Sequence, residues 1–184
     1  MRIETGRLIL RTFVESDHDD LYEFLSQLRD DEFGRMLRPR RATIEDIPAL
    51  CEARVKQLVD EGLQPDEPIQ DDLRVYFEKT LSDETLVEWV LEDEGKIVAT
   101  AGIAFMPFPP TFSNPIGTRG YVTNMYTAPS HRGRGIATHL LALLMDEARQ
   151  RGVHKIVLHA SKMGRSVYKR QGFHPANGWM ELDL

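Results

Sequence analysis

The chain has 184 residues, of which 41% are hydrophobic and 28% charged, and its formal net charge at pH 7 is −6. This composition is that of an ordinary globular protein of one domain, and it excludes a disordered chain. The acidic balance argues against a nucleic-acid partner, which would require a basic face. No apolar run approaches the roughly 18 residues of a membrane-spanning helix, and the first residues lack the apolar segment of a signal peptide. We therefore expect a cytoplasmic protein that does not bind membranes.

The front of the chain contains the same strand-then-helix pattern twice. Residues 8–13 are predicted to form a short strand, and residues 16–17 can cap a helix with apolar residues at helical spacing. Residues 36–38 form a second candidate strand, and Thr43 caps a second helix with an apolar stripe that ends before Gly62. Either pair could supply the first strand and helix of the domain.

The middle of the chain is predicted to contain a helix, a hairpin and a loop. Pro68 stands at the start of the helix, whose apolar stripe includes Phe77. Residues 86–91 and 97–105 are two β-rich runs joined by a turn, so we expect them to pair as a hairpin. Residues 107–117 hold four prolines without periodicity, which predicts an irregular loop.

The last third of the chain is predicted to be a strand–helix–strand crossover. A strand over 120–127 precedes a strongly amphipathic helix over 136–151, and a second strand follows over 153–160. Two strands joined in this way lie roughly parallel in one sheet. A short helix over 164–170 and a last strand over 179–183 complete an α/β fold.

The segment between that strand and helix is suited to hold phosphate. Gly133 and Gly135 let the backbone approach a ligand closely, and the helix start beyond them presents N–H groups without helical partners. Arg132 and Arg134 add positive charge, so we expect a pyrophosphate as the ligand. A Rossmann fingerprint would need a small residue where Thr138 stands, and the Gly-Lys-Ser/Thr of a P-loop is absent.

Two motifs resemble those of the GNAT acetyltransferases. Residues 132–137, Arg-Gly-Arg-Gly-Ile-Ala, are similar to the family motif Gln/Arg-x-x-Gly-x-Gly/Ala, whose backbone amides bind the pyrophosphate of acetyl-CoA. Residues 161–173 are similar to the family segment Asn-x-x-Ala-x-x-x-Tyr-x-x-x-Gly-Phe, with Ser161 in place of Asn and Gly164 in place of Ala. The resemblance is clear from about residue 120 to 173 and looser before that.

The resemblance implies a mixed α/β fold in which a central twisted sheet is flanked by helices. In the family a first strand and two helices precede the hairpin, and residues 36–82 supply them here. We therefore expect an acetyltransferase domain over 35–184, with residues 1–34 as an extra strand–helix unit packed on it. Residues 7–11 also resemble the opening of some family members.

The resemblance also implies roles for individual residues. Tyr168 matches the tyrosine that protonates the departing coenzyme A thiolate, while a packing role is the alternative for a tyrosine on a short helix. Glu88 is the candidate general base, and Asn124 is the candidate group that orients the amine. The residues expected to contact acetyl-CoA are Met125, Tyr126, Thr127, Arg132, Gly133, Arg134, Gly135, Ile136, Ala137, Thr138, Ser161 and Ser166.

The implied activity is transfer of an acetyl group from acetyl-CoA to a primary amine of a small molecule or peptide, by direct attack in a ternary complex. No metal is expected, because the histidines lack the spacing of metal ligands. The alternative is a non-catalytic acetyl-CoA-binding sensor or interaction module. The protein is expected to be a monomer or a homodimer.

Overall fold

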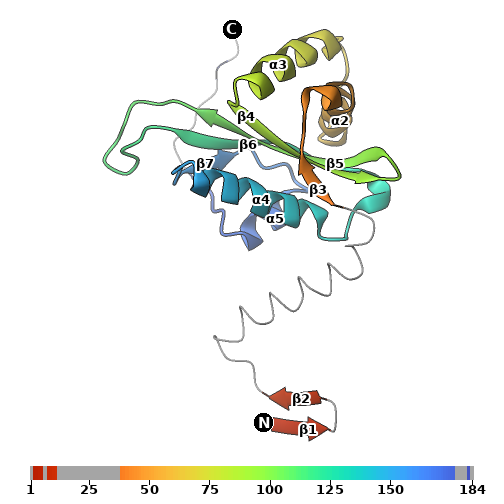
Figure 1. The fold of residues 1–184 in the computed structure, drawn as a ribbon, viewed down its shortest axis with the longest axis vertical. Helices are drawn as coiled ribbons and strands as arrows, with labels where there is room; N and C mark the ends of the chain where they lie inside the picture. Colours follow the sequence, from red (N-terminus) through yellow and green to blue (C-terminus); the bar gives the residue numbers. More distant parts are fainter. Residues whose placement is uncertain (1, 6–7, 12–37, 177–181, 183–184) are drawn as a thin grey trace. The chain divides into compact units, whose positions relative to one another are not determined.

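The protein forms two units, residues 1–38 and 39–184, and its computed structural model describes residues 2–5, 8–11, 38–176 and 182 (Figure 1). In the first unit, β1 (Arg2–Thr5) and β2 (Leu8–Arg11) pair antiparallel. Strand β2 agrees with the first four residues of the predicted strand, whereas β1 was not predicted. The helix expected after residues 16–17 lies outside the described residues, and the domain boundary at residue 34 stays a prediction.

The second unit is built on a mixed sheet of five strands in the order β3-β4-β5-β6-β7. Strands β3 to β6 run antiparallel to their neighbours, while β6 and β7 are parallel. The predicted hairpin and the predicted parallel crossover are therefore confirmed. The strands are β3 (Pro39–Arg41), β4 (Leu86–Asp93), β5 (Lys96–Met106), β6 (Arg119–Thr127) and β7 (Ile156–Leu158).

The first strand of this sheet lies three residues later than predicted. The prediction placed it over 36–38, of which only Arg38 is described, and Arg38 precedes β3. Strand β3 starts at Pro39 and, among the described strands, pairs with β4 alone. Proline has no N–H to donate to a ladder, so it is tolerated at the start of an edge strand. Residues 36–37 lie outside the described residues, and the strand is found at the residues that follow them.

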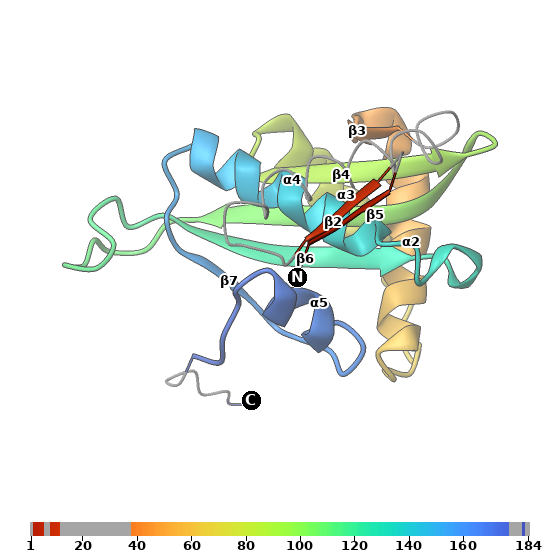
Figure 2. The same ribbon diagram turned by 90° about the horizontal axis from the view of Figure 1, so that it is seen from below.

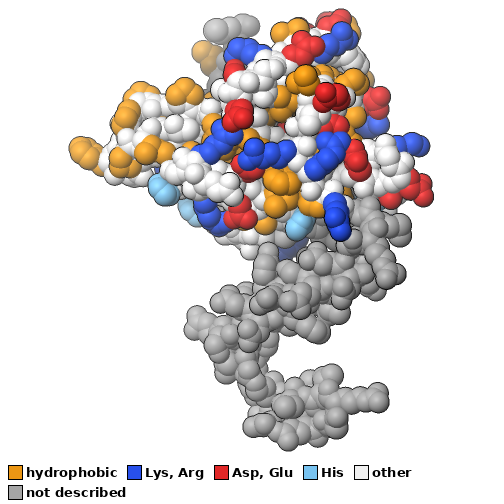
Figure 3. Space-filling view, viewed as in Figure 1, with side chains coloured by type: hydrophobic (Ala, Val, Ile, Leu, Met, Phe, Trp, Pro, Cys, Tyr) orange, Lys and Arg blue, Asp and Glu red, His pale blue; other side chains and the backbone are white. Residues whose placement is uncertain are grey.

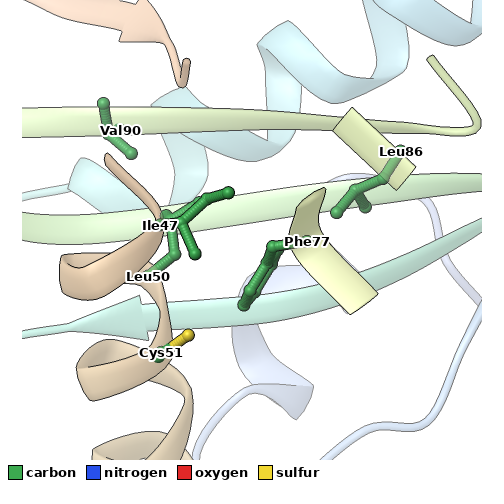
Figure 4. Close-up of a cluster of buried hydrophobic side chains, with 6 residues drawn as sticks. All are labelled: Ile47, Leu50, Cys51, Phe77, Leu86 and Val90. Carbon is green, nitrogen blue, oxygen red and sulfur yellow. The ribbon is translucent and has the colours of Figure 1, made fainter. Parts of the chain in front are cut away.

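Helices α2 (Ile47–Asp60) and α3 (Gln70–Ser82) cover one face of the sheet. A 3-10 turn, η1 (Ile44–Asp46), leads into α2, and the Thr43 N–H donates to the Asp46 carboxylate at 2.8 Å. The helix predicted from Pro68 begins two residues later, at Gln70. Figure 4 shows the core between these helices and β4, which consists of Ile47, Leu50, Cys51, Phe77, Leu86 and Val90.

Helix α4 (Ile136–Gln150) covers the opposite face, behind the sheet in Figure 4 and along its near side in Figure 2. Its predicted apolar stripe is confirmed, since Leu140, Leu141 and Leu144 are completely buried. The Val153 N–H bonds back to the Ala148 carbonyl at 2.8 Å. This bond makes residue 153 part of the helix end, so β7 is shorter than the strand predicted over 153–160.

The chain ends with α5 (Arg165–Arg170), which contacts α4 and follows β7 (Figure 2). It agrees with the short helix predicted over 164–170. The last predicted strand, over 179–183, lies outside the described residues except for Leu182, which is in no strand. Among the described helices, none is both long and apolar enough to cross a membrane.

The predicted proline-rich loop joins β5 and β6 and projects from the sheet (Figure 1). Its backbone is held by hydrogen bonds in both directions between Thr111 and Asn114, and by the Asn114 amide, which donates to the Thr118 carbonyl at 3.1 Å. The side chains of Phe112 and Ile116 remain exposed at the tip. Hydrophobic side chains gather in the region of this loop in Figure 3.

Candidate active site

Strands β6 and β7 pair along only part of their length. Gly120, Tyr121 and Val122 lie opposite Ile156, Val157 and Leu158, and the pairing stops there. From Thr123 onwards β6 has no strand partner on this side within the described part of the chain. Backbone groups along this stretch are therefore available to a ligand, because each N–H and C=O needs a hydrogen-bond partner.

The same stretch of β6 contains a β-bulge on its other side. Thr100 of β5 lies opposite Tyr126, but Gly102 lies opposite Thr123. Ala101 therefore faces two residues, Asn124 and Met125, which is the defining feature of a bulge. Asn124 adopts a left-handed conformation with φ of +53°, which is uncommon for a residue other than glycine.

A cavity of about 150 Å³ opens beside this part of β6. We call it the β6 cavity. It collects seven of the residues predicted for the site, namely Met125, Tyr126, Thr127, Arg132, Ala137, Ser161 and Tyr168. It also contains residues that the sequence reasoning missed, namely Gln57, Asp60 and Glu61 from the end of α2, and Met163, Gly164 and Val167. The residues of β6 that are expected to contact acetyl-CoA and the predicted proton donor, Tyr168, thus line the same cavity.

Tyr168 lies on α5 with its side chain buried against the cavity. Its ring packs edge-on against Phe173, with the centroids 5.9 Å apart. Burial raises the pKa of Tyr168 to about 12, and the nearby Glu61 carboxylate and Tyr121 add to the rise. The phenol is therefore fully protonated at neutral pH, as a proton donor must be.

The turn before α5 explains one departure from the family motif. The Gly164 N–H donates to Ser161 Oγ at 3.2 Å, so Ser161 keeps the hydrogen-bonding role of a polar residue at this position. A Cβ atom on Gly164 would lie 2.7 Å from Cε2 of the Tyr168 ring. In this chain the tyrosine ring therefore occupies the space that a methyl group on residue 164 would need.

The predicted pyrophosphate loop has the backbone that its glycines suggested. Gly133 and Gly135 have φ of +76° and +80°, and Gly135 is the N-cap of α4. The loop is tied to β4 by His131, whose Nε2 lies 2.8 Å from the Asp93 carboxylate. Arg134 is exposed and available to an anion.

The Arg132 side chain bonds to two other parts of the protein. Its guanidinium donates to Asp60 at 2.5 Å and to the Thr127 carbonyl at 2.9 Å. It therefore links the loop to the end of α2. The remaining predicted contacts, Ile136, Thr138 and Ser166, do not line the β6 cavity, and the Ile136 side chain is buried in the core.

Glu88 and Asn124 are brought together beneath the bulge. The Asn124 amide donates to Glu88 Oε2 at 3.1 Å, and both side chains are buried. Burial raises the pKa of Glu88 to about 8, although the hydrogen bond from Asn124 and the charge of Arg54 oppose the rise. The other carboxyl oxygen, Oε1, has no hydrogen-bond partner among the residues that the structure describes.

Comparison with known proteins identifies the family of this chain. The profile of the acetyltransferase (GNAT) family matches residues 48–173, a range that includes the bulge, the loop and Tyr168. The chain belongs to the GNAT acetyltransferase family. It is therefore an acetyl-CoA-dependent N-acetyltransferase with the GNAT fold, and its acceptor is an amine.

Three relatives place this GNAT protein more closely. It is 49% identical to a predicted acetyltransferase from Clostridium acetobutylicum, solved with acetyl-CoA, with a TM-score of 0.79 over 80% of this chain and 96% of that one. It is 30% identical to the uncharacterized N-acetyltransferase YjgM of Escherichia coli over 73% of this chain and 80% of the relative. It is 29% identical to a glucosamine 6-phosphate N-acetyltransferase of Trypanosoma brucei brucei over 49% of this chain, but spans only 59% of that enzyme.

Proposed function

We propose that the enzyme transfers the acetyl group directly from acetyl-CoA to a primary amine of a small molecule or peptide, with both substrates bound at once. The observation that carries this proposal is the position of Tyr168, a protonated phenol that lines the same cavity as the unpaired stretch of β6. A proton donor beside a strand with free backbone groups suits the breakdown of a thioester, because the departing thiolate must be protonated.

The residues present fit acetyl-CoA. The free edge of β6 at Met125, Tyr126 and Thr127 suits the amide-rich pantetheine arm, and the left-handed glycines before α4 leave N–H groups open for the pyrophosphate. The cosubstrate supplies an activated acetyl group. The backbone amides of β6 would polarise its carbonyl, and Arg134 would add positive charge near the phosphates.

For the proton that the amine loses, we propose Glu88 as the acceptor, with Asn124 orienting the amine. With a pKa of about 8, the Glu88 side chain becomes a carboxylate that can accept a proton as the pH approaches 8. Because the Glu88 side chain is only 1% exposed, the proton would reach it through a water molecule. Glu88 would then take up the proton without touching the substrate.

The charges around the β6 cavity favour a cationic acceptor. Asp60 and Glu61 both lie at the C-terminal end of α2, where the helix dipole is already negative. Arg132 neutralises Asp60, whereas Glu61, among the residues that the structure describes, accepts a hydrogen bond from the neutral Gln57 amide at 3.1 Å and forms no ion pair. A carboxylate repels the negatively charged phosphates of coenzyme A, so neither side chain is suited to bind them. We therefore propose that Glu61 attracts the ammonium group of the acceptor.

The test is a screen of primary amines with acetyl-CoA, following free thiol and acetylated product together. Tyr168→Phe keeps the ring but removes the proton donor, so turnover should fall about 10²–10⁴-fold while the affinity for acetyl-CoA changes little. Turnover close to the native value in this variant would return Tyr168 to a packing role. Binding of acetyl-CoA without turnover on any amine would instead favour the non-catalytic sensor.

A further inference from the structure

The bulge on β6 is secured by a side chain from the neighbouring strand. Thr100 is 2% exposed, and its hydroxyl donates to the backbone carbonyl of Asn124 at 2.7 Å. A buried carbonyl that leaves the regular ladder must find another partner or lose about 1–3 kcal/mol. The Thr100 hydroxyl is that partner, and its β-branched side chain holds the hydroxyl in a restricted set of rotamers.

This hydrogen bond determines where the next N–H points. The Asn124 carbonyl and the Met125 N–H belong to one peptide plane, in which the two groups point in opposite directions. Since the carbonyl points towards Thr100 on β5, the Met125 N–H points away from β5. Met125 lines the β6 cavity, and no strand in the described part of the chain pairs with β6 there on its other side.

The side chain of Asn124 is fixed as well, so the left-handed conformation is held from two directions. Its amide donates to Glu88, which lies opposite Gly102 in the β4–β5 pair. A Cβ atom on Gly102 would lie 2.1 Å from Glu88 Oε2. Gly102 therefore leaves the space in which the Glu88 carboxyl can meet Asn124.

We propose that Thr100 is a positioning residue for acetyl-CoA. By holding the Asn124 carbonyl, it aims the Met125 N–H at the arm of the bound thioester without touching it. This inference rests on the proposed role of the β6 amides in holding that arm. It predicts that loss of the hydroxyl weakens acetyl-CoA binding even when the sheet stays intact.

The test compares Thr100→Val, which keeps the shape but lacks the hydroxyl, with Thr100→Ser, which keeps the hydroxyl. We expect the acetyl-CoA dissociation constant, measured by calorimetry on the full chain, to rise about tenfold in Thr100→Val, equivalent to about 1.4 kcal/mol. Thr100→Ser should stay within about twofold to threefold of the wild type. Thr80→Val is the matched control, because Thr80 makes a 2.7 Å bond of the same kind to the Tyr76 carbonyl on α3, outside the cavity.

Several outcomes would overturn the inference. Equal dissociation constants for Thr100→Val and the wild type would show that the hydroxyl only stabilises the fold, and so would equal weakening in Thr100→Ser and Thr100→Val. If Thr100→Val does not fold, Thr100→Ala replaces it in the comparison with Thr100→Ser. Failure of the wild type to bind acetyl-CoA would refute the proposed function itself, whereas wild-type binding with an unaffected Thr100→Val refutes only the role of Thr100.

Discussion

Replacing Gly164 by alanine tests whether Tyr168 is placed as the acid. The new Cβ would lie 2.7 Å from Tyr168 Cε2, whereas ordinary contact begins at 3.4 Å, so the ring has to retreat by about 0.7 Å, the difference between these distances. The ring is buried and packs against Phe173, so solvent cannot absorb the shift. Overpacking of this kind costs about 1–3 kcal/mol of stability.

A displaced acid should affect turnover more than binding. A misplacement of about 1 Å can cost about 10²-fold in rate, so we expect Gly164→Ala to lower kcat by about 10-fold to 100-fold. Its acetyl-CoA dissociation constant should change little, because the β6 amides and the loop glycines stay in place. Thiol release on the acceptor found in the amine screen measures kcat, and calorimetry measures the dissociation constant.

The control is a double-mutant cycle with Tyr168→Phe. Once the hydroxyl is gone, moving the ring should matter little, so adding Gly164→Ala to Tyr168→Phe should lower turnover by much less than it does in the wild type. Equal losses in the two backgrounds would mean that Gly164→Ala acts through the cavity wall. Full activity of the single variant would refute the placement of the Tyr168 phenol described above.

Three further results are expected. Replacing Gly135 by valine should abolish the rise in melting temperature that coenzyme A causes, because φ is +80° there, while Gly152→Val, at the other end of α4 with φ of +68°, should keep it. The pKa of Glu88 is about 8 in the folded protein and near 4.5 when unfolded, so the folded state holds a proton that the unfolded chain releases. The free energy of unfolding should therefore fall from about pH 5 to pH 8, and Glu88→Gln should lack this component in denaturant titrations. Glu61→Gln should raise KM for a cationic amine more than it lowers kcat, and an unchanged KM would contradict the role proposed for Glu61.

Local patterns in the sequence were enough to predict the parts of the site that follow one another along the chain. The glycines at 133 and 135 predict a tight loop before a helix, and Tyr168 has the sequence spacing from Gly172 that the family motif requires. These features depend on backbone conformation and short spacing, which a sequence shows directly. The hairpin and the parallel crossover were predictable for the same reason.

The parts of the site that depend on distant partners could not be predicted. Arg132 meets Asp60, which lies 72 residues away in the chain, so its engagement with α2 has no local signal. The bulge at Asn124 arises from a register shift against β5, which only the paired strands reveal. Polar residues at the end of α2 offered one usable hint, since Gln57 and Glu61 lie four residues apart and share one face of the helix.

The proposed catalytic groups lie on two parts of the chain that are bonded to each other only over the short pairing of β6 with β7 in the described structure. The amides of Met125 and Tyr126 lie on a strand that is bonded along most of its length to β5. The segment that carries Tyr168 follows β7, which pairs with β6 through three residue pairs in the described part of the chain. Local unfolding begins where few bonds must break. Amides of β7 should therefore exchange with solvent faster than those of β5. A transient opening between β6 and β7 would separate Tyr168 from Met125 and Tyr126, and would offer coenzyme A a way out after each turnover.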